Sequence, residues 1–174
     1  VQSGVGRTGT FFAYEQFNIT PDILCFAKGM ANGFPIGGIL TSNKISDSMT
    51  VGSHGTTFGG GPIACAIGSR VVDIISKKAF LTKVLSKEKR LIKKLNEINL
   101  SYQCFNEIRS AGLWISVELA SIDVDDLIKL SHKNGLMVLK ANATTIRFSP
   151  SLIIEDSLID NGLEIFEKSI LQLQ

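Results

Sequence analysis

The sequence predicts an α/β fold that is built in two parts, and two observations lead to this prediction. Thirteen of the sixteen glycines lie in residues 1–68, a stretch with only three basic and three acidic side chains. From residue 77 onward, apolar residues instead recur at helical spacing and alternate with short apolar runs typical of strands. We therefore expect one domain boundary, between residues 1–76 and residues 77–174.

The pattern of residues 1–76 predicts two short strands and one helix. The apolar run Ile23–Phe26 reads as a buried strand and Phe34–Leu40 as a second, each bounded by glycine or proline. Pro62–Ser76 is rich in alanine and isoleucine on nearly all sides, as in a helix that is buried over most of its surface. Pro62 is compatible with the first turn of that helix, where no N–H is needed.

Residues 77–174 predict helices and strands in the order α-β-α-β-β-α. Leu81–Ile98 has apolar residues at helical spacing with lysines between them, so the basic cluster from Lys77 to Lys94 is interpreted as a solvated helix face. Gly135 is a natural helix stop. Such an order suits a small sheet with helices on one face. The other elements are a strand at Leu113–Leu119, a helix at Asp123–Asn134, strands at Leu136–Lys140 and Thr145–Phe148, and a helix at Glu155–Leu171.

Composition narrows the class of protein. The formal net charge is only +2 and no Lys/Arg run is interleaved with aromatics, which argues against a nucleic-acid partner. No apolar run approaches the about 20 residues of a bilayer span, and no secretory leader pattern is present, so we expect no membrane association. Three widely spaced cysteines without CxxC spacing indicate neither a metal site nor a disulfide scaffold, and a reducing cytoplasm fits best.

Lys28 is the first candidate for chemistry. It follows the predicted strand Ile23–Phe26 almost directly, and α/β sheets place their ligands at the carboxyl ends of strands. A lysine there can form a Schiff base with a carbonyl compound. A solvated loop lysine is the alternative. The surrounding segment AKGMANGFPIGG favours a pocket, because its glycines allow the backbone to approach a flat ligand closely.

A second glycine-rich segment, GSHGTTFGGGP at residues 52–62, precedes the helix that starts at Pro62. Helix amino termini and glycine-rich turns offer N–H donors to an anion, and Thr56 and Thr57 add hydroxyl donors. The segment therefore resembles a phosphate cradle, although a plain connecting turn is the alternative. His54 is interpreted as a brace for the loop.

Two arginines flank or occupy apolar strands. Arg147 lies within Thr145–Phe148, where a guanidinium needs an anionic partner. That partner is either a substrate carboxylate, which the guanidinium fork binds bidentately, or a structural ion pair with Glu118 or Glu107. Arg109 has polar neighbours and a structural role is favoured for it, with Trp114 pointing inward a few residues later.

Five segments of the chain resemble class III aminotransferases of fold type I, and the acetylornithine and ornithine branch most of all. They occur in family order and with family-like spacing, and they are VQSGVGRTG, PDILCFAKGMANGFPIGG, HGTTFGGGP, IRSAGLWISVEL and TIRFSPSL. The resemblance implies that residues 1–76 are the end of a large mixed-sheet domain that binds pyridoxal 5′-phosphate. Residues 77–174 would be the C-terminal small α/β domain.

The resemblance also assigns roles to single residues. Lys28 would hold the cofactor as a Schiff base, Gln2 would hydrogen-bond its phenolic oxygen, and Val1 would pack on its ring. Thr57 would bind the cofactor phosphate of a neighbouring subunit, which implies a homodimer. Arg147 would hold the α-carboxylate of the substrate. The implied reaction moves the terminal amino group of N-acetylornithine, or a similar ω-amino acid, to 2-oxoglutarate, giving a semialdehyde and glutamate, as in arginine biosynthesis.

The sequence leaves several alternatives open and departs from the family pattern in places. Ornithine, succinylornithine, 4-aminobutyrate and lysine-pathway substrates are the enzyme alternatives, and a non-catalytic homologue or relic is the alternative of another class. The sequence begins at Val1 within a glycine-rich segment, without the family's preceding acidic pair and amino-terminal part. We therefore expect a fragment that is inactive by itself. Gly61 also replaces the usual asparagine of the GGNP motif.

Overall fold

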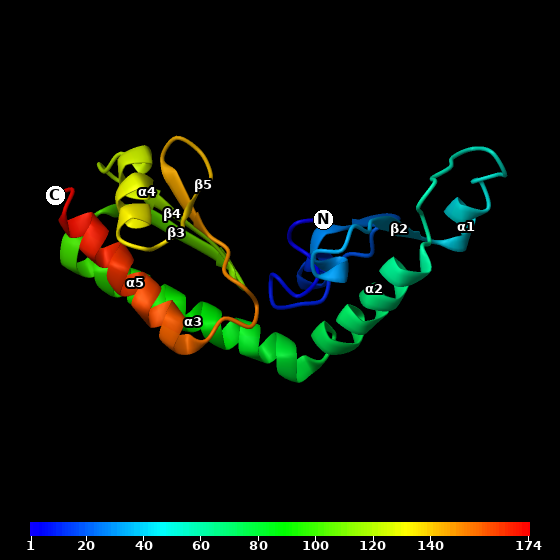
Figure 1. Ribbon diagram of the computed structural model, residues 1–174, viewed down its shortest axis with the longest axis horizontal. Helices are drawn as coiled ribbons and strands as arrows, with labels where there is room; N and C mark the ends of the chain where they lie inside the picture. The colour runs from blue at the N-terminus through cyan, green and yellow to red at the C-terminus, as the bar shows by residue number, and fades with distance from the viewer. The chain divides into compact units, whose positions relative to one another are not determined.

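The computed structural model describes all residues from Val1 to Gln174, and they form two compact units, Val1–Leu81 and Thr82–Gln174 (Figure 1). The boundary falls within the long helix α3 (Lys78–Tyr102). None of the helices combines the length and the apolarity that crossing a membrane requires. Each unit has its own sheet and its own core.

The first unit contains a two-stranded hairpin of β1 (Ile23–Phe26) and β2 (Gly38–Thr41), paired antiparallel with Phe26 opposite Gly38. The strand predicted at Ile23–Phe26 is confirmed, but its predicted burial is wrong, because Ile23 and Cys25 are exposed on the two-stranded hairpin. The second strand was predicted to begin at Phe34 and this start is wrong, because the chain turns before it pairs, and Pro35 has no N–H for a ladder. The unit's remaining short elements are η1 (Ala13–Gln16), η2 (Lys28–Ala31) and α1 (Asn43–Ser46).

Helix α2 (Pro62–Ile75) packs on η2 and completes the first unit's core. That core centres on Val5, Met30 and Val71. The prediction that α2 is buried on most sides is wrong, because only Ala64, Gly68 and Val71 are buried along it. Ile63 is 66% exposed. Within this unit, η2 and its neighbouring loops cover only one face of the helix.

The second unit has a four-stranded antiparallel sheet in the order β3-β4-β6-β5. β3 (Phe105–Ala111) is an edge strand that the sequence pattern did not predict, and β5 (Leu139–Lys140) is shorter than the predicted Leu136–Lys140. β4 (Trp114–Leu119) and β6 (Thr145–Phe148) form the centre. The observed order is thus α-β-β-α-β-β-α. One sheet face is apolar and buried, with the side chains Ile115, Val117, Leu119, Ile146 and Phe148.

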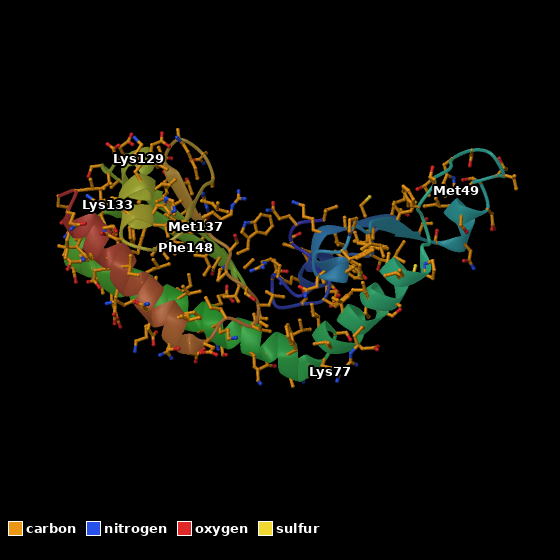
Figure 2. All side chains as sticks on the ribbon, viewed as in Figure 1. Met49, Lys77, Lys129, Lys133, Met137 and Phe148 are labelled. Carbon is orange, nitrogen blue, oxygen red and sulfur yellow. The ribbon has the colours of Figure 1, made fainter.

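Helices cover that apolar sheet face. α3 and α5 (Asp156–Leu171) run side by side (Figure 1), joined by a bidentate pair in which Arg90 Nε and Nη2 donate to Asp160 at 2.6 and 2.5 Å. This ion pair holds the pKa of the Asp160 carboxyl below its usual value. Phe148, labelled in Figure 2, meets Phe166 of α5 edge-to-face with ring centroids 5.0 Å apart. The predicted helices Leu81–Ile98 and Glu155–Leu171 are confirmed, α3 being longer than predicted and α5 starting one residue later, with Glu155 as its N-cap.

Helix α4 (Val124–Lys133) is capped at both ends, and the sequence analysis predicted the carboxyl-terminal stop. The Asp123 carboxylate accepts the N–H groups of Asp125 and Asp126 at 2.9 and 3.0 Å, which caps the first turn. At the other end, Gly135 N–H donates to His132 O and Leu136 N–H to Ser131 O, as in a Schellman motif. The interpretation of Gly135 as a helix stop is confirmed.

The two units differ in the size of their cores. All twelve of the largest fully buried side chains belong to the second unit, and they are Phe166, Leu95, Ile98, Leu113, Ile115, Leu127, Ile146, Leu163, Ile170, Val84, Val117 and Val124. The first unit has only five buried apolar residues, Val5, Met30, Ala31, Ala64 and Val71, with partly buried neighbours around them. Since burial of apolar surface is the main favourable term in folding, the second unit is the more firmly packed of the two.

The turn between β3 and β4 predicts a measurable effect of one substitution. Ala111 pairs with Trp114, so Gly112 and Leu113 form a two-residue loop, and Gly112 has φ +57°. Glycine at the first loop position is what a type II′ turn requires. We expect Gly112→Ala to destabilise the protein by about 1–2 kcal/mol, the cost of a left-handed residue, in urea unfolding. Gly55→Ala is the matched control, because Gly55 has open space around its Cα and no positive φ. Equal midpoints for both variants would contradict this account of the turn.

Candidate functional site

Lys28 follows β1 after one residue and begins η2, so its predicted place at the carboxyl end of a strand is confirmed. Its backbone is left-handed, with φ +53°. The side chain is exposed and its Nζ forms no ion pair or hydrogen bond within the chain. The primary amine is therefore available to a ligand.

Buried neighbours fix the backbone around Lys28. Met30 and Ala31, the next residues of η2, are only 6% and 1% exposed and lie in the core beside α2. Gly29 lies against Val5, since a Cβ at Gly29 would be 3.7 Å from the Val5 Cβ. Val5 also has a left-handed backbone, with φ +53°. Such residues cost of order 1–3 kcal/mol each and gather at ligand sites.

An open depression of about 390 Å³ adjoins Lys28, with Phe34 and Pro35 among its apolar walls. The other lining residues are Gly29, Asn32, Gly33 and Ile36. The glycines of this segment were expected to let the backbone approach a ligand, and the structure supports only part of this explanation. Gly33 takes a positive φ of +104°, whereas Gly38 is required by the protein itself, since a Cβ there would lie 2.6 Å from the Phe26 ring.

Val1 and Gln2 lie at the start of the same unit, and both are exposed. Val1 is 51% exposed and the Gln2 amide makes no hydrogen bond within the chain. The segment that follows them is fixed by Thr8 Oγ1, which donates to Ser3 O at 3.1 Å. The two side chains are thus free to contact a ligand, and no hydrogen bond joins either of them to Lys28.

The loop before α2 distinguishes its two threonines. Thr56 Oγ1 accepts the Gly59 N–H at 3.2 Å, so its oxygen stabilises the loop while its O–H stays available as a donor. The Thr57 hydroxyl makes no such bond and is exposed. Gly61 is the N-cap of α2 and supplies no side-chain cap, which leaves the first amides of the helix unpaired. The loop therefore has donors for an anion, as the phosphate-cradle interpretation requires. His54 Nδ1 lies 3.3 Å from Ser53 Oγ, which fits a bracing role.

Arg147 belongs to the second unit and lies on the sheet face opposite to the helices. Its neighbours in register are Ser116 of β4 and Leu139 of β5. No carboxylate lies within ion-pair distance of it, so the structural alternative of a pair with Glu118 or Glu107 is wrong. Glu107 instead receives Arg109 Nη1 at 2.8 Å. This pair supports the structural role expected for Arg109. Arg147 has no such partner, so its N–H donors are free.

Trp114 is the residue whose role the sequence reasoning missed. It was expected to point inward, but on β4 it alternates with the buried Ile115 and so shares a face with Ser116 and Arg147. The Arg147 guanidinium carbon lies 5.8 Å from the centre of the Trp114 ring, a cation–π contact. Strict alternation along Leu113–Leu119 could have predicted this side of the strand, because Ile115, Val117 and Leu119 define the apolar face.

Comparison with known proteins gives matches over nearly the whole chain. The family model for aminotransferase class-III matches residues 1–170. An acetylornithine/succinyldiaminopimelate aminotransferase of Photorhabdus laumondii is 45% identical over 99% of this chain and 44% of its own length. An acetylornithine aminotransferase of Vibrio cholerae is 44% identical, again over 99% of this chain and 44% of its own length. The chain thus spans less than half the length of these relatives.

Solved structures give the same fold. The N-acetylornithine aminotransferase of Stenotrophomonas maltophilia superposes with a TM-score of 0.89 at 29% identity, over 99% of this chain and 45% of that one. The ornithine aminotransferase of Toxoplasma gondii, described with partial occupancy of PLP at its active site, superposes with a TM-score of 0.91 at 28% identity, over 99% of this chain and 42% of that one. Both similarities extend across the hairpin, the Lys28 region and the strand of Arg147.

Proposed function

The chain belongs to the class-III aminotransferase family, and on that premise we propose that it forms part of an enzyme that binds pyridoxal 5′-phosphate through Lys28. The reaction is the transfer of an amino group between an amino acid and an oxo acid. The observation that carries the proposal is the unpaired Lys28 amine, which is fixed at a strand end beside an open depression. In this assignment, residues 1–76 are the end of a large cofactor domain and residues 77–174 a small domain.

The residues present fit this cofactor. The depression beside Lys28 has apolar walls for a flat ring, and the free Thr57 hydroxyl and the unpaired amides of α2 suit a phosphate. When bound, the cofactor supplies an electron sink for the substrate carbon. Lys28 Nζ first holds the cofactor and then, once released, carries a proton as a general base and acid. Gln2 is assigned to the phenolic oxygen of the cofactor, and Val1 to the face of its ring.

The substrate assignment is narrower than the family and is drawn from the relatives. We infer that the amino donor is N-acetylornithine or a similar ω-amino acid and that 2-oxoglutarate is the acceptor, as in arginine biosynthesis in the cytoplasm. The names of the similar proteins support acetylornithine, and succinyldiaminopimelate and ornithine are the other substrates that those names carry. The free donors of Arg147 suit the carboxylate that these substrates share.

One assay tests the proposed function. The full gene product that contains this chain is incubated with pyridoxal phosphate and 2-oxoglutarate, and glutamate is measured with N-acetylornithine, ornithine, succinylornithine or 4-aminobutyrate as the donor. We expect N-acetylornithine to give the largest kcat/KM. Activity only with another donor would refute the substrate assignment alone. A protein that binds no cofactor and transfers no amino group would support the non-catalytic homologue instead.

The proposed assignment of Thr57 to the neighbouring subunit predicts complementation between an inactive variant and a variant that binds the cofactor weakly. Lys28→Ala lacks the amine, and Thr57→Ala lacks the phosphate donor and is expected to hold the cofactor about tenfold more weakly, since charge-assisted hydrogen bonds contribute about 1.5–3 kcal/mol. In a mixed dimer, one site would combine Lys28 of one subunit with Thr57 of the other. We therefore expect the mixture to regain activity at limiting cofactor. Thr57→Ser is the control, because it keeps the hydroxyl donor. If mixing gives no gain in activity, Thr57 either acts in the site of its own subunit or does not contact the cofactor.

A further inference from the structure

We propose that Trp114 is a positioning residue for Arg147, holding its guanidinium by the flat face so that the edge with the N–H donors stays open to a substrate carboxylate. This inference rests on the proposed function, because it takes Arg147 to be the carboxylate-binding residue. It adds a residue whose side chain acts through Arg147 and not on the substrate itself.

The geometry of the pair is that of a cation above a ring. The Arg147 guanidinium carbon lies 5.8 Å from the centre of the Trp114 ring, within the range of an energetically significant contact. Both side chains leave the same face of the sheet, because Arg147 is opposite Ser116 in the register and Trp114 is two residues before Ser116 on β4. They are diagonal neighbours across two central strands, a spacing that aromatic and long side chains bridge.

Trp114 is itself firmly placed. It directly follows the tight turn at Gly112 and Leu113, and Leu113 is fully buried, so the turn cannot shift without opening the core. On the other side, the fully buried Ile115 fixes the next position of β4. A ring attached between two anchored residues is a rigid support, and an indole has only two side-chain torsions to restrict. The long Arg147 side chain gains most from such a support, since it otherwise loses about 2 kcal/mol of rotamer entropy on being fixed.

The charges around Arg147 explain why a ring is suited to this task. A carboxylate would hold the guanidinium through its N–H groups and would then compete with the substrate for the same donors. On this sheet face the carboxylates are either engaged or not directed at Arg147. Glu107 is paired with Arg109 at 2.8 Å, and Glu118, which lies opposite Thr145, forms no ion pair. A contact through the ring face leaves all N–H donors unused, and the planar fork then binds a carboxylate bidentately.

The test compares three variants of the full gene product loaded with cofactor. Trp114→Leu removes the ring but keeps an apolar side chain, and Trp114→Phe restores a smaller ring. Leu139→Ala is the matched control, because Leu139 flanks Arg147 on the other side in β5 but has no ring. For Trp114→Leu we expect KM for 2-oxoglutarate to rise about three- to tenfold, the range that a contact of this type supports, with kcat changed less than about twofold. Trp114→Phe should recover most of this loss, and Leu139→Ala should resemble the wild type.

A binding readout that does not depend on turnover completes the test. Trp114 is the only tryptophan of this chain, so the fluorescence difference between wild type and Trp114→Phe reports on its ring. We expect this difference to change on titration with 2-oxoglutarate, and to lose that response in Arg147→Lys. If Trp114→Leu and Leu139→Ala both bind the oxo acid as tightly as the wild type while Arg147→Lys binds it poorly, the inference is overturned and the proposed function stands. If Arg147→Lys also binds normally, the proposed role of Arg147 fails together with it.

Discussion

Replacement of Lys28 by alanine is expected to abolish amino-group transfer by the full gene product. The variant should bind pyridoxal phosphate without a covalent link, so that borohydride treatment followed by dialysis leaves no cofactor absorbance on the protein. Loss of a positioned general base and acid alone costs about 10²- to 10⁴-fold in rate, and loss of the covalent step adds to this. The measurement is single-turnover formation of the oxo product, together with the near-visible band before and after reduction.

Lys44→Ala is the control for this experiment, because Lys44 is an exposed lysine of α1 in the same unit and has no assigned role. It should keep both the reducible band and the activity. A Lys28→Ala protein that still retains cofactor after borohydride would show that another lysine forms the link. In that case the unpaired amine beside the depression is a solvated loop lysine, and the assignment of the whole site fails.

Replacement of Arg147 by glutamine is expected to have the second largest effect. Removing one partner of a hydrogen-bonded charge pair costs about 2–5 kcal/mol, which corresponds to a rise of roughly 30-fold or more in KM for 2-oxoglutarate. Arg147→Lys should lie between glutamine and the wild type, because it keeps the charge but loses the bidentate fork. Steady-state kinetics with varied 2-oxoglutarate measure both variants.

Arg109→Gln is the matched control for Arg147. Both arginines flank Ser116, on β3 and β6 respectively, but the guanidinium of Arg109 is already paired with Glu107. We expect Arg109→Gln to change KM less than twofold, since exposed ion pairs contribute about 0–1 kcal/mol. Equal effects of the two substitutions would mean that the general positive potential of this sheet face, and not the geometry of Arg147, attracts the carboxylate.

The sequence predicted the helices of this fold better than its strands. The α3, α4 and α5 helices have regular apolar spacing or caps, such as the Asp123 carboxylate, and their positions were found within a few residues. β3 was missed because it is an edge strand with a shifted register between Phe105 and Glu107, and only Ile108 points an apolar side chain inward from its middle. A strand that pairs on one side and has few buried residues gives little alternation to detect.

The candidate site was predictable where chemistry depends on local sequence and not where it depends on pairing. The position of Lys28 after a strand followed from the run Ile23–Phe26 alone. The choice between a substrate and Glu118 or Glu107 as the partner of Arg147 needed the strand register, which placed Glu107 beside Arg109. The contact with Trp114 likewise joins two strands that are far apart in the chain.

The unequal cores of the two units lead to unequal protection of their amides from hydrogen exchange. Exchange from a packed core requires near-global opening, whereas a segment with few buried contacts opens at a lower free energy. The amides around Lys28 rest on a core of only five buried apolar residues, and the backbone is left-handed at Lys28 and at Val5, which packs beneath Gly29. They should therefore exchange well before those of β4 and β6. A ligand that binds only the closed form slows this opening by mass action, so exchange in η2 would report cofactor occupancy without any turnover.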